Sequence, residues 1–146
     1  YAQFIGFQQN GQMQFTPPVQ VVYALRRALD LFFKETAQGR INRYRKNYQI
    51  LYDGLKQQGF EFLLSDNYQS GILIAVKEPI NNEYSFINMH NFLLKQGFTV
   101  YPGKGAKEAT FRLSILGDLY PEDILRFLEC MSDYLKFSGI KELLYN

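Results

Sequence analysis

The sequence predicts an α/β fold in which helices pack on one small sheet that is mixed or mainly antiparallel. Two observations lead to this prediction. Apolar residues recur at helical spacing in several segments, and between them lie short apolar runs of strand length bounded by turn residues. The expected order is helix, helix, strand, strand, helix, strand, strand, helix, which is typical of helices that cover a small sheet.

Helical periodicity is clearest in two stretches that follow residues 1–15, which show no clean period. The first helix is expected to begin at Thr16-Pro17-Pro18, because threonine is a good N-cap and proline fits the first helical position. Gly39 is expected to separate it from a second helix, which Gly59 stops. The apolar stripes of the two helices are formed by Val22, Leu25, Leu29, Phe32, Ile41, Tyr44, Tyr48, Leu51 and Leu55.

Strand patterns fill much of the second half of the chain. Strands are expected at 60–64, 71–76, 98–101 and 110–116. Ser85 is expected to cap a short helix that Gly97 stops, and Pro121 is expected to open the last helix. Glu122 and Asp123 lie in the first turn of that last helix, where negative charge suits the helix dipole.

Composition narrows the classes of function. The chain has 146 residues and a net charge of +2, which fits one globular domain and gives no electrostatic footprint for nucleic acid or a membrane surface. Cys130 is the sole cysteine, so we expect no disulfide and a reducing compartment such as the cytoplasm. No apolar run approaches the roughly 20 residues of a membrane span. The chain begins Tyr1-Ala2-Gln3 without methionine, so we expect a piece of a longer protein.

Arg112 is the most informative single residue. Alternation along the last expected strand puts it on the face opposite Phe111 and Leu113. An arginine in mid-strand is unfavourable unless it is paired or directed at a ligand, and its planar guanidinium matches a carboxylate or phosphonate with two parallel hydrogen bonds. The alternative is a solvated arginine on an edge strand, or one paired with an acid such as Asp118.

Other candidate residues have simpler interpretations beside the functional ones. Thr16 is a helix cap, although a capped helix start also favours phosphate. The Pro102-Gly103-Lys104-Gly105 stretch lacks Walker spacing and is interpreted as a turn, and nothing in the sequence favours Lys104 as a cofactor-binding lysine. His90, the only histidine, lies in an amphipathic helix, so we expect no metal site and no catalytic triad. Cys130 is expected to be an inert buried thiol.

Three stretches together resemble one family. They are Phe15-Thr16-Pro17-Pro18, Tyr101-Pro102-Gly103-Lys104 and the run from Thr110 to Asp118. In this order they look like the C-terminal portion of 2-aminoethylphosphonate–pyruvate transaminases, which are class V aminotransferases with the type I fold of pyridoxal-phosphate (PLP) enzymes. The segment from Arg40 to Gly59, with Arg43-Tyr44 and Asn47, is similar to the family's long helix leading to the small domain. The resemblance runs from Tyr1 to about Phe137.

The resemblance implies a division of the chain and a role for two residues. Residues 1–38 would belong to, or lead from, the large PLP domain, and 39–146 would form the small C-terminal domain. By resemblance, Thr16 reaches the cofactor phosphate of the partner subunit in a homodimer. Arg112 holds the carboxylate of pyruvate or alanine and is a candidate contact for the donor's phosphonate.

The implied reaction transfers an amino group from 2-aminoethylphosphonate to pyruvate, giving phosphonoacetaldehyde and L-alanine. The lysine that binds PLP and the aspartate that pairs with its pyridine nitrogen are expected upstream of this chain, so we expect no catalytic residue here and an inactive fragment. Two alternatives remain open. One is another class V aminotransferase, of the alanine–glyoxylate type, and the other is a non-catalytic module that binds a partner or a small anion.

Overall fold

The structure is a computed structural model of residues 1–146, and it describes all of them except Gln14 and Asn146. The chain forms two compact units, Tyr1–Arg40 and Ile41–Asn146. Within the described residues, no helix is both long and apolar enough to cross a membrane. The functional division at residues 38 and 39 stays a prediction.

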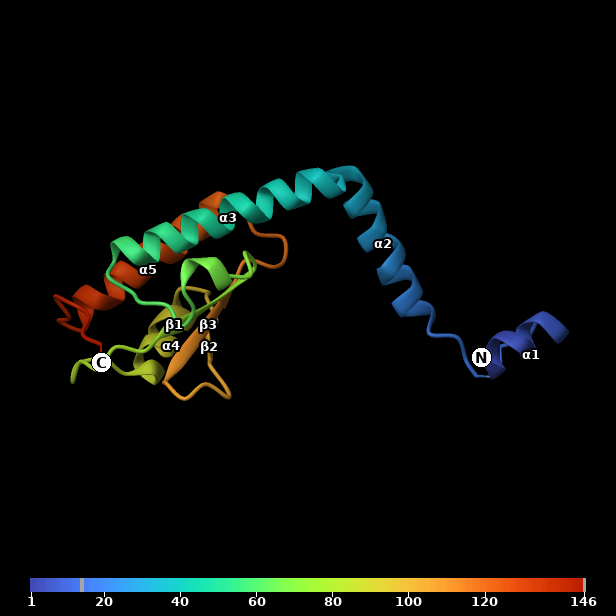
Figure 1. Cartoon of the computed structure of the whole chain (residues 1–146). Coiled ribbons are helices and arrows are strands. Elements are labelled where there is room, and N and C mark those ends of the chain that lie inside the picture. The colour runs from blue at the N-terminus through green and yellow to red at the C-terminus, as the bar shows by residue number, and fades with distance from the viewer. Residues whose placement is uncertain (14, 146) are drawn as a thin grey trace. The chain divides into compact units, whose positions relative to one another are not determined.

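The first unit contains helices α1 (Ala2–Asn10) and α2 (Val19–Glu35), drawn in blue in Figure 1. Helix α1 lies where the sequence shows no helical period, and it ends at the left-handed Gly11, which donates its N–H to the carbonyl of Phe7 at 2.8 Å. Helix α2 begins at Val19 with Pro18 at its N-cap, so the expected start at Thr16 is wrong. None of the apolar residues of α2 is buried within this chain.

The boundary between α2 and α3 (Ala37–Gln57) lies at Thr36 rather than at Gly39. Thr36 has a φ of 69°, unusual for a β-branched residue, and this value breaks the helical path. Its Oγ1 then accepts the N–H of Gly39 at 3.1 Å, and its carbonyl accepts the N–H of Arg40 at 3.1 Å. A threonine therefore caps a helix in this unit, but it is Thr36 at the start of α3.

The second unit is built on a three-stranded antiparallel sheet with the order β1-β3-β2. Its strands are β1 (Leu73–Lys77), β2 (Tyr101–Pro102) and β3 (Thr110–Ser114). The strand expected at 60–64 is reduced to a single bridge between Phe62 and Val76, followed by a 3-10 helix at Asp66–Tyr68. The sheet is antiparallel throughout, which agrees with the predicted fold class.

Three helices supply the apolar cover of this sheet: α3, α4 (Phe86–Lys95) and α5 (Pro121–Phe137). Figure 1 shows α3 and α5 running side by side, and a Cβ added to Gly54 on α3 would clash with the side chain of Leu128 on α5. The predicted cap of α4 is confirmed, because Ser85 Oγ accepts the N–H of Asn88 at 3.4 Å. The buried core is formed by Leu51, Tyr52, Leu55, Phe60, Ile74, Val76, Met89, Leu93, Val100, Phe111, Leu113, Ile115, Ile124, Phe127, Leu128, Met131 and Tyr134.

One face of the sheet packs on this core, and the other does not. In β3, Phe111 and Leu113 are buried, whereas Arg112 and Ser114 are exposed. The alternation follows from the two-residue period of a strand. The face that carries Arg112 is therefore open to solvent along the middle of the sheet.

Candidate functional site

Arg112 lies on the central strand of the sheet. It pairs with Ala75 of β1 on one side and with Tyr101 of β2 on the other. Residues paired in this way project from the same face, with Cβ atoms roughly 5 Å apart. The alternative of an edge-strand arginine is therefore wrong, and a central position fixes the backbone beneath Arg112 from both sides.

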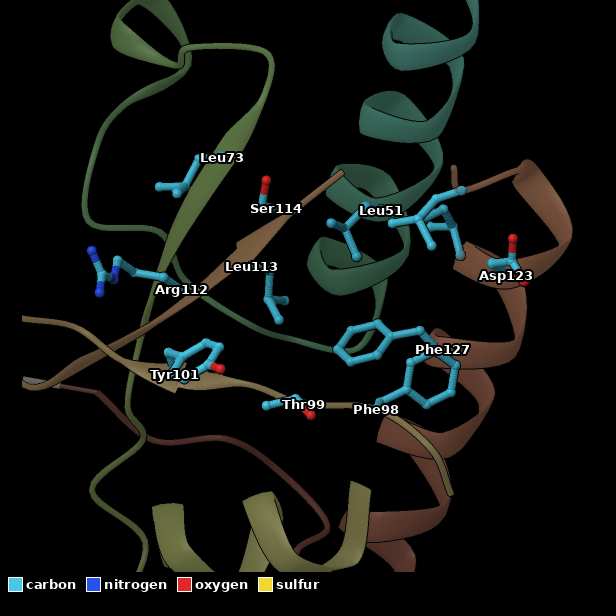
Figure 2. Close-up of a pocket in the computed structure, with 12 residues that line it drawn as sticks. Leu51, Leu73, Phe98, Thr99, Tyr101, Arg112, Leu113, Ser114, Asp123 and Phe127 are labelled. Atoms are coloured by element: carbon cyan, nitrogen blue, oxygen red, sulfur yellow. The ribbon is translucent and has the colours of Figure 1, made fainter. Parts of the chain in front are cut away.

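The guanidinium of Arg112 has no partner among the residues that the structure describes: it forms no hydrogen bond and no ion pair there. Asp118, the acid proposed from the sequence, does not pair with it. Figure 2 shows Arg112 extending away from Leu51, Leu113 and Phe127. An exposed, unpaired guanidinium on a rigid strand can bind a carboxylate or phosphonate from outside the chain.

A cavity of about 320 Å³ adjoins Arg112. It lies beside the part of β3 that β2 does not pair, because β2 contains only Tyr101 and Pro102. Its wall is mainly apolar, and its polar lining residues are Thr99, Tyr101, Arg112, Ser114 and Asp123, of which Arg112 directs its guanidinium away from the apolar ones (Figure 2). The apolar lining is formed by Leu51, Leu73, Phe98, Leu113, Leu119, Ile124 and Phe127.

Sequence reasoning missed Tyr101 as a neighbour of Arg112. Its side chain is 65% exposed and lies in the same cross-strand row, so both can contact one ligand. Ser114 is on the same face, but its hydroxyl already accepts the N–H of Leu116 at 3.2 Å. The pairing of Tyr101 with Arg112 depends on strand register, which the sequence motifs alone do not state.

Thr16 lies in the first unit, on the segment between α1 and α2, and is exposed. Pro18 is the N-cap of α2 and supplies no side-chain cap bond, so Thr16 has no capping role there. The N–H groups of the first turn of any helix lack intrahelical partners and favour anions. An exposed hydroxyl three residues before the first residue of such a turn fits a phosphate group, and this is the part of PLP that the described residues of the first unit can accommodate.

The remaining candidates have structural roles or none. Lys104 is exposed in the loop between β2 and β3, where the Gly103 N–H bonds the Thr110 carbonyl at 2.6 Å. His90 Nδ1 lies 2.9 Å from the Val100 carbonyl oxygen. Cys130 is partly buried against the core, slightly more accessible than expected. The described residues contain no group of histidine, cysteine and acidic side chains placed to hold a metal ion.

The segment that follows β3 is hydrogen-bonded to side chains of α3. Arg43 Nη1 lies 3.0 Å from the carbonyl oxygen of Gly117 and 2.7 Å from that of Leu119. Asn47 Nδ2, one turn further along α3, lies 2.7 Å from the same Leu119 oxygen. The Gly117 N–H donates to the hydroxyl of Tyr44 at 3.4 Å. These contacts link the end of the Arg112 strand to α3.

Tyrosines with shifted pKa values also lie on α3. Burial, together with the hydrogen bond to the Asp66 carboxylate, raises the pKa of Tyr52 to about 12. The same hydrogen bond, with the nearby Lys56 ammonium, lowers the pKa of Asp66. These groups stabilise the neutral tyrosine and the ionised carboxylate, and they join α3 to the 3-10 helix.

Comparisons with known proteins identify relatives that are much longer than this chain. No protein-family model matches it. It is 34% identical over 128 residues to a protein of Phocaeicola vulgatus and 37% identical over 126 residues to one of Bacillus cytotoxicus, both named 2-aminoethylphosphonate–pyruvate transaminase. These matches cover 87% and 86% of this chain but 35% and 34% of the relatives. A third relative with this name, from Cupriavidus pinatubonensis, is 33% identical over 96% of the chain and 37% of its own length. The chain thus spans about a third of the curated relatives.

Solved structures agree on the fold. The ureidoglycine–glyoxylate aminotransferase of Bacillus subtilis matches 97% of this chain with a TM-score of 0.78 and 20% identity, over 37% of its own length. The alanine–glyoxylate aminotransferase of Nostoc sp. matches 90% with a TM-score of 0.76 and 22% identity, over 36% of its length. Over nearly its whole length, this chain is thus similar to the C-terminal portion of proteins named 2-aminoethylphosphonate–pyruvate transaminase, and it shares its fold with part of two solved aminotransferases.

Proposed function

We propose that the enzyme containing this chain transfers an amino group from 2-aminoethylphosphonate to pyruvate, giving phosphonoacetaldehyde and L-alanine. The supporting observation is that relatives bearing this name are 33–37% identical over nearly the whole chain. PLP, when bound, supplies the electron sink for the transfer. The lysine that binds it and most of its other contacts belong, in this proposal, to the large domain.

Arg112 binds and orients the carboxylate of pyruvate or alanine. Its guanidinium has no partner in the described part of the chain, so anion binding breaks no existing ion pair. Both neighbouring strands support its backbone, which lets the side chain hold a carboxylate in one orientation through two parallel hydrogen bonds. Correct orientation of the acceptor is a large part of what a protein contributes to such a reaction.

Thr16 would hold the phosphate of PLP bound to the partner subunit of a homodimer. Its exposed hydroxyl and the start of α2 fit a phosphate, as described above. The same proposal assigns residues 1–38 to a segment of, or leading from, the large domain and 39–146 to the small domain. A cytoplasmic location suits a chain with a single cysteine.

The test is a donor and acceptor screen on the full-length enzyme. We expect alanine to form from pyruvate faster with 2-aminoethylphosphonate as the amino donor than with any other donor. An enzyme with PLP bound that is inactive on this pair would contradict the proposal.

A second candidate is an alanine–glyoxylate type of reaction, because two of the solved structures with this fold carry glyoxylate in their names. Glyoxylate and pyruvate share the carboxylate that Arg112 would bind, so this residue does not separate them. The same screen does, since only the first reaction consumes a phosphonate.

A further inference from the structure

The contacts between α3 and the segment after β3 define a pair of side chains that act on the same short stretch of backbone. Arg43 bonds the carbonyls of Gly117 and Leu119, and Asn47 bonds that of Leu119. Figure 1 shows this orange segment between β3 and α5 reaching α3. Two side chains one helical turn apart therefore converge on the Leu119 carbonyl.

Arg43 is held in place by more than its hydrogen bonds. Its guanidinium carbon lies 5.1 Å from the ring centroid of Tyr44 and 5.1 Å from that of Tyr120. Contacts of this kind are worth about 0.5–1 kcal/mol each at exposed sites. They restrict a long side chain that would otherwise have many rotamers, so the two carbonyls are held at a defined distance from α3.

Asn47 is energetically unfavourable at its buried position. Its side chain is 0% exposed, and its Oδ1 has no hydrogen-bond partner in the described part of the chain. A buried polar atom without a partner costs free energy, which an apolar residue would avoid. What the asparagine adds is the single bond from Nδ2 to the Leu119 carbonyl. This bond fixes backbone position rather than maximising core stability.

The Gly117–Leu119 backbone that these side chains bind follows directly after β3, the strand that carries Arg112. Strand β3 is held at one side by its pairing with β1, which ends with Ile115 donating its N–H to the Ile72 carbonyl at 3.1 Å. The chain then turns at Gly117, where φ is 120°, and meets Arg43 and Asn47. Without the two side chains, the sheet would remain paired and packed on α3 through the apolar core, but the carbonyls of Gly117 and Leu119 would lose their bonds to α3.

We propose that Arg43 and Asn47 are positioning residues that set the placement of Arg112 for its anionic substrate. This inference rests on the proposed function, in which Arg112 binds the acceptor's carboxylate. Neither residue touches the substrate. They act through the Gly117–Leu119 backbone and β3.

The test uses Arg43→Gln in the full-length enzyme, with Arg45→Gln as a matched control. Arg45 lies two residues along the same helix, is exposed and has no partner in the described part of the chain. Misplacing a binding group by about 1 Å can cost up to about a hundredfold, so we expect the KM for pyruvate to rise by about tenfold or more in Arg43→Gln. Retention of PLP and kcat at saturation should change much less, and Arg43→Lys, which keeps one carbonyl bond, should be intermediate.

Two further measurements separate positioning from simple structural support. Combined with Arg112→Lys, Arg43→Gln should add little to the KM effect, because the two changes act on one contact. A melting temperature that falls while KM stays within about twofold of the wild type would overturn the proposal, and so would an equal KM effect in both backgrounds.

A final measurement needs no substrate. In this chain labelled with 15N, the Arg112 Nε–H signal should shift in Arg43→Gln and in Asn47→Ala, but not in Arg45→Gln. If the full-length enzyme is inactive on the proposed substrates and the signal shifts, the proposed function fails and the positioning role stands. An unshifted Arg112 signal refutes the positioning role, whatever the enzyme does.

Discussion

Replacing Arg112 with lysine should damage anion binding and leave the fold intact. The structure supports both halves of this prediction. Arg112 is exposed and has no partner in the described part of the chain, so a lysine there should change the free energy of unfolding by no more than about 0.5 kcal/mol. Lysine keeps the charge but loses the planar fork that makes two parallel bonds. Loss of one charge-assisted hydrogen bond, worth about 1.5–3 kcal/mol, lowers specificity for pyruvate by about 10- to 150-fold.

The assay combines a melting curve of the variant with single-turnover kinetics of the full-length enzyme on pyruvate. Arg45→Lys, a change of the same type on an exposed part of α3, serves as the control and should be silent in both measurements. Near wild-type rates with pyruvate in Arg112→Lys would remove this residue from the substrate site. A large loss of stability would point instead to a contact within the protein.

Three other predictions concern caps, pH and the exposed lysine. Thr16→Ala should weaken PLP retention in the full-length enzyme without changing the stability of this chain, whereas Thr36→Ala removes a real cap and should cost about 1 kcal/mol in urea unfolding; unchanged PLP affinity in Thr16→Ala would exclude the phosphate contact. Because folding raises the pKa of Tyr52 from 10.0 to about 12, its contribution to the free energy of unfolding is complete below pH 10 and is lost as the pH rises towards 12. Tyr52→Phe should flatten that decline, and an unchanged slope would exclude Tyr52 as a source. Borohydride treatment of this chain with PLP should leave Lys104 without stoichiometric label, as judged by mass spectrometry, and a stoichiometric adduct with turnover would refute the assignment of the cofactor lysine to the large domain.

Sequence patterns located most helices because periodicity and local capping determine them. Ser85, Gly97 and Pro121 mark helix ends through side-chain and backbone chemistry that needs no tertiary partner. The strands were harder to delimit. Residues 60–64 have strand-like composition, yet only Phe62 forms a bridge. Strand-like composition is not sufficient, because strand formation also depends on packing against neighbouring strands.

The start of α2 shows how a favourable local pattern can mislead. Thr16 and Pro17 satisfy the preferences for a cap and a first helical position, but the N-cap is Pro18 and the helix begins at Val19, two residues after Pro17. Arg112 was identifiable from alternation alone. Its central position, its row with Tyr101 and its link to Arg43 and Asn47 depend on strand order and on contacts between residues more than 70 positions apart in the chain, which no local pattern encodes.

The open face of the sheet has a practical consequence for solution work. A cation that faces solvent attracts every small anion present, and at physiological ionic strength its field falls off over about 8 Å. Phosphate and sulfate have the geometry that a guanidinium prefers, so these buffer ions compete with pyruvate for Arg112. Affinities measured in phosphate buffer will therefore understate the contact, and zwitterionic buffers at low chloride are the appropriate medium.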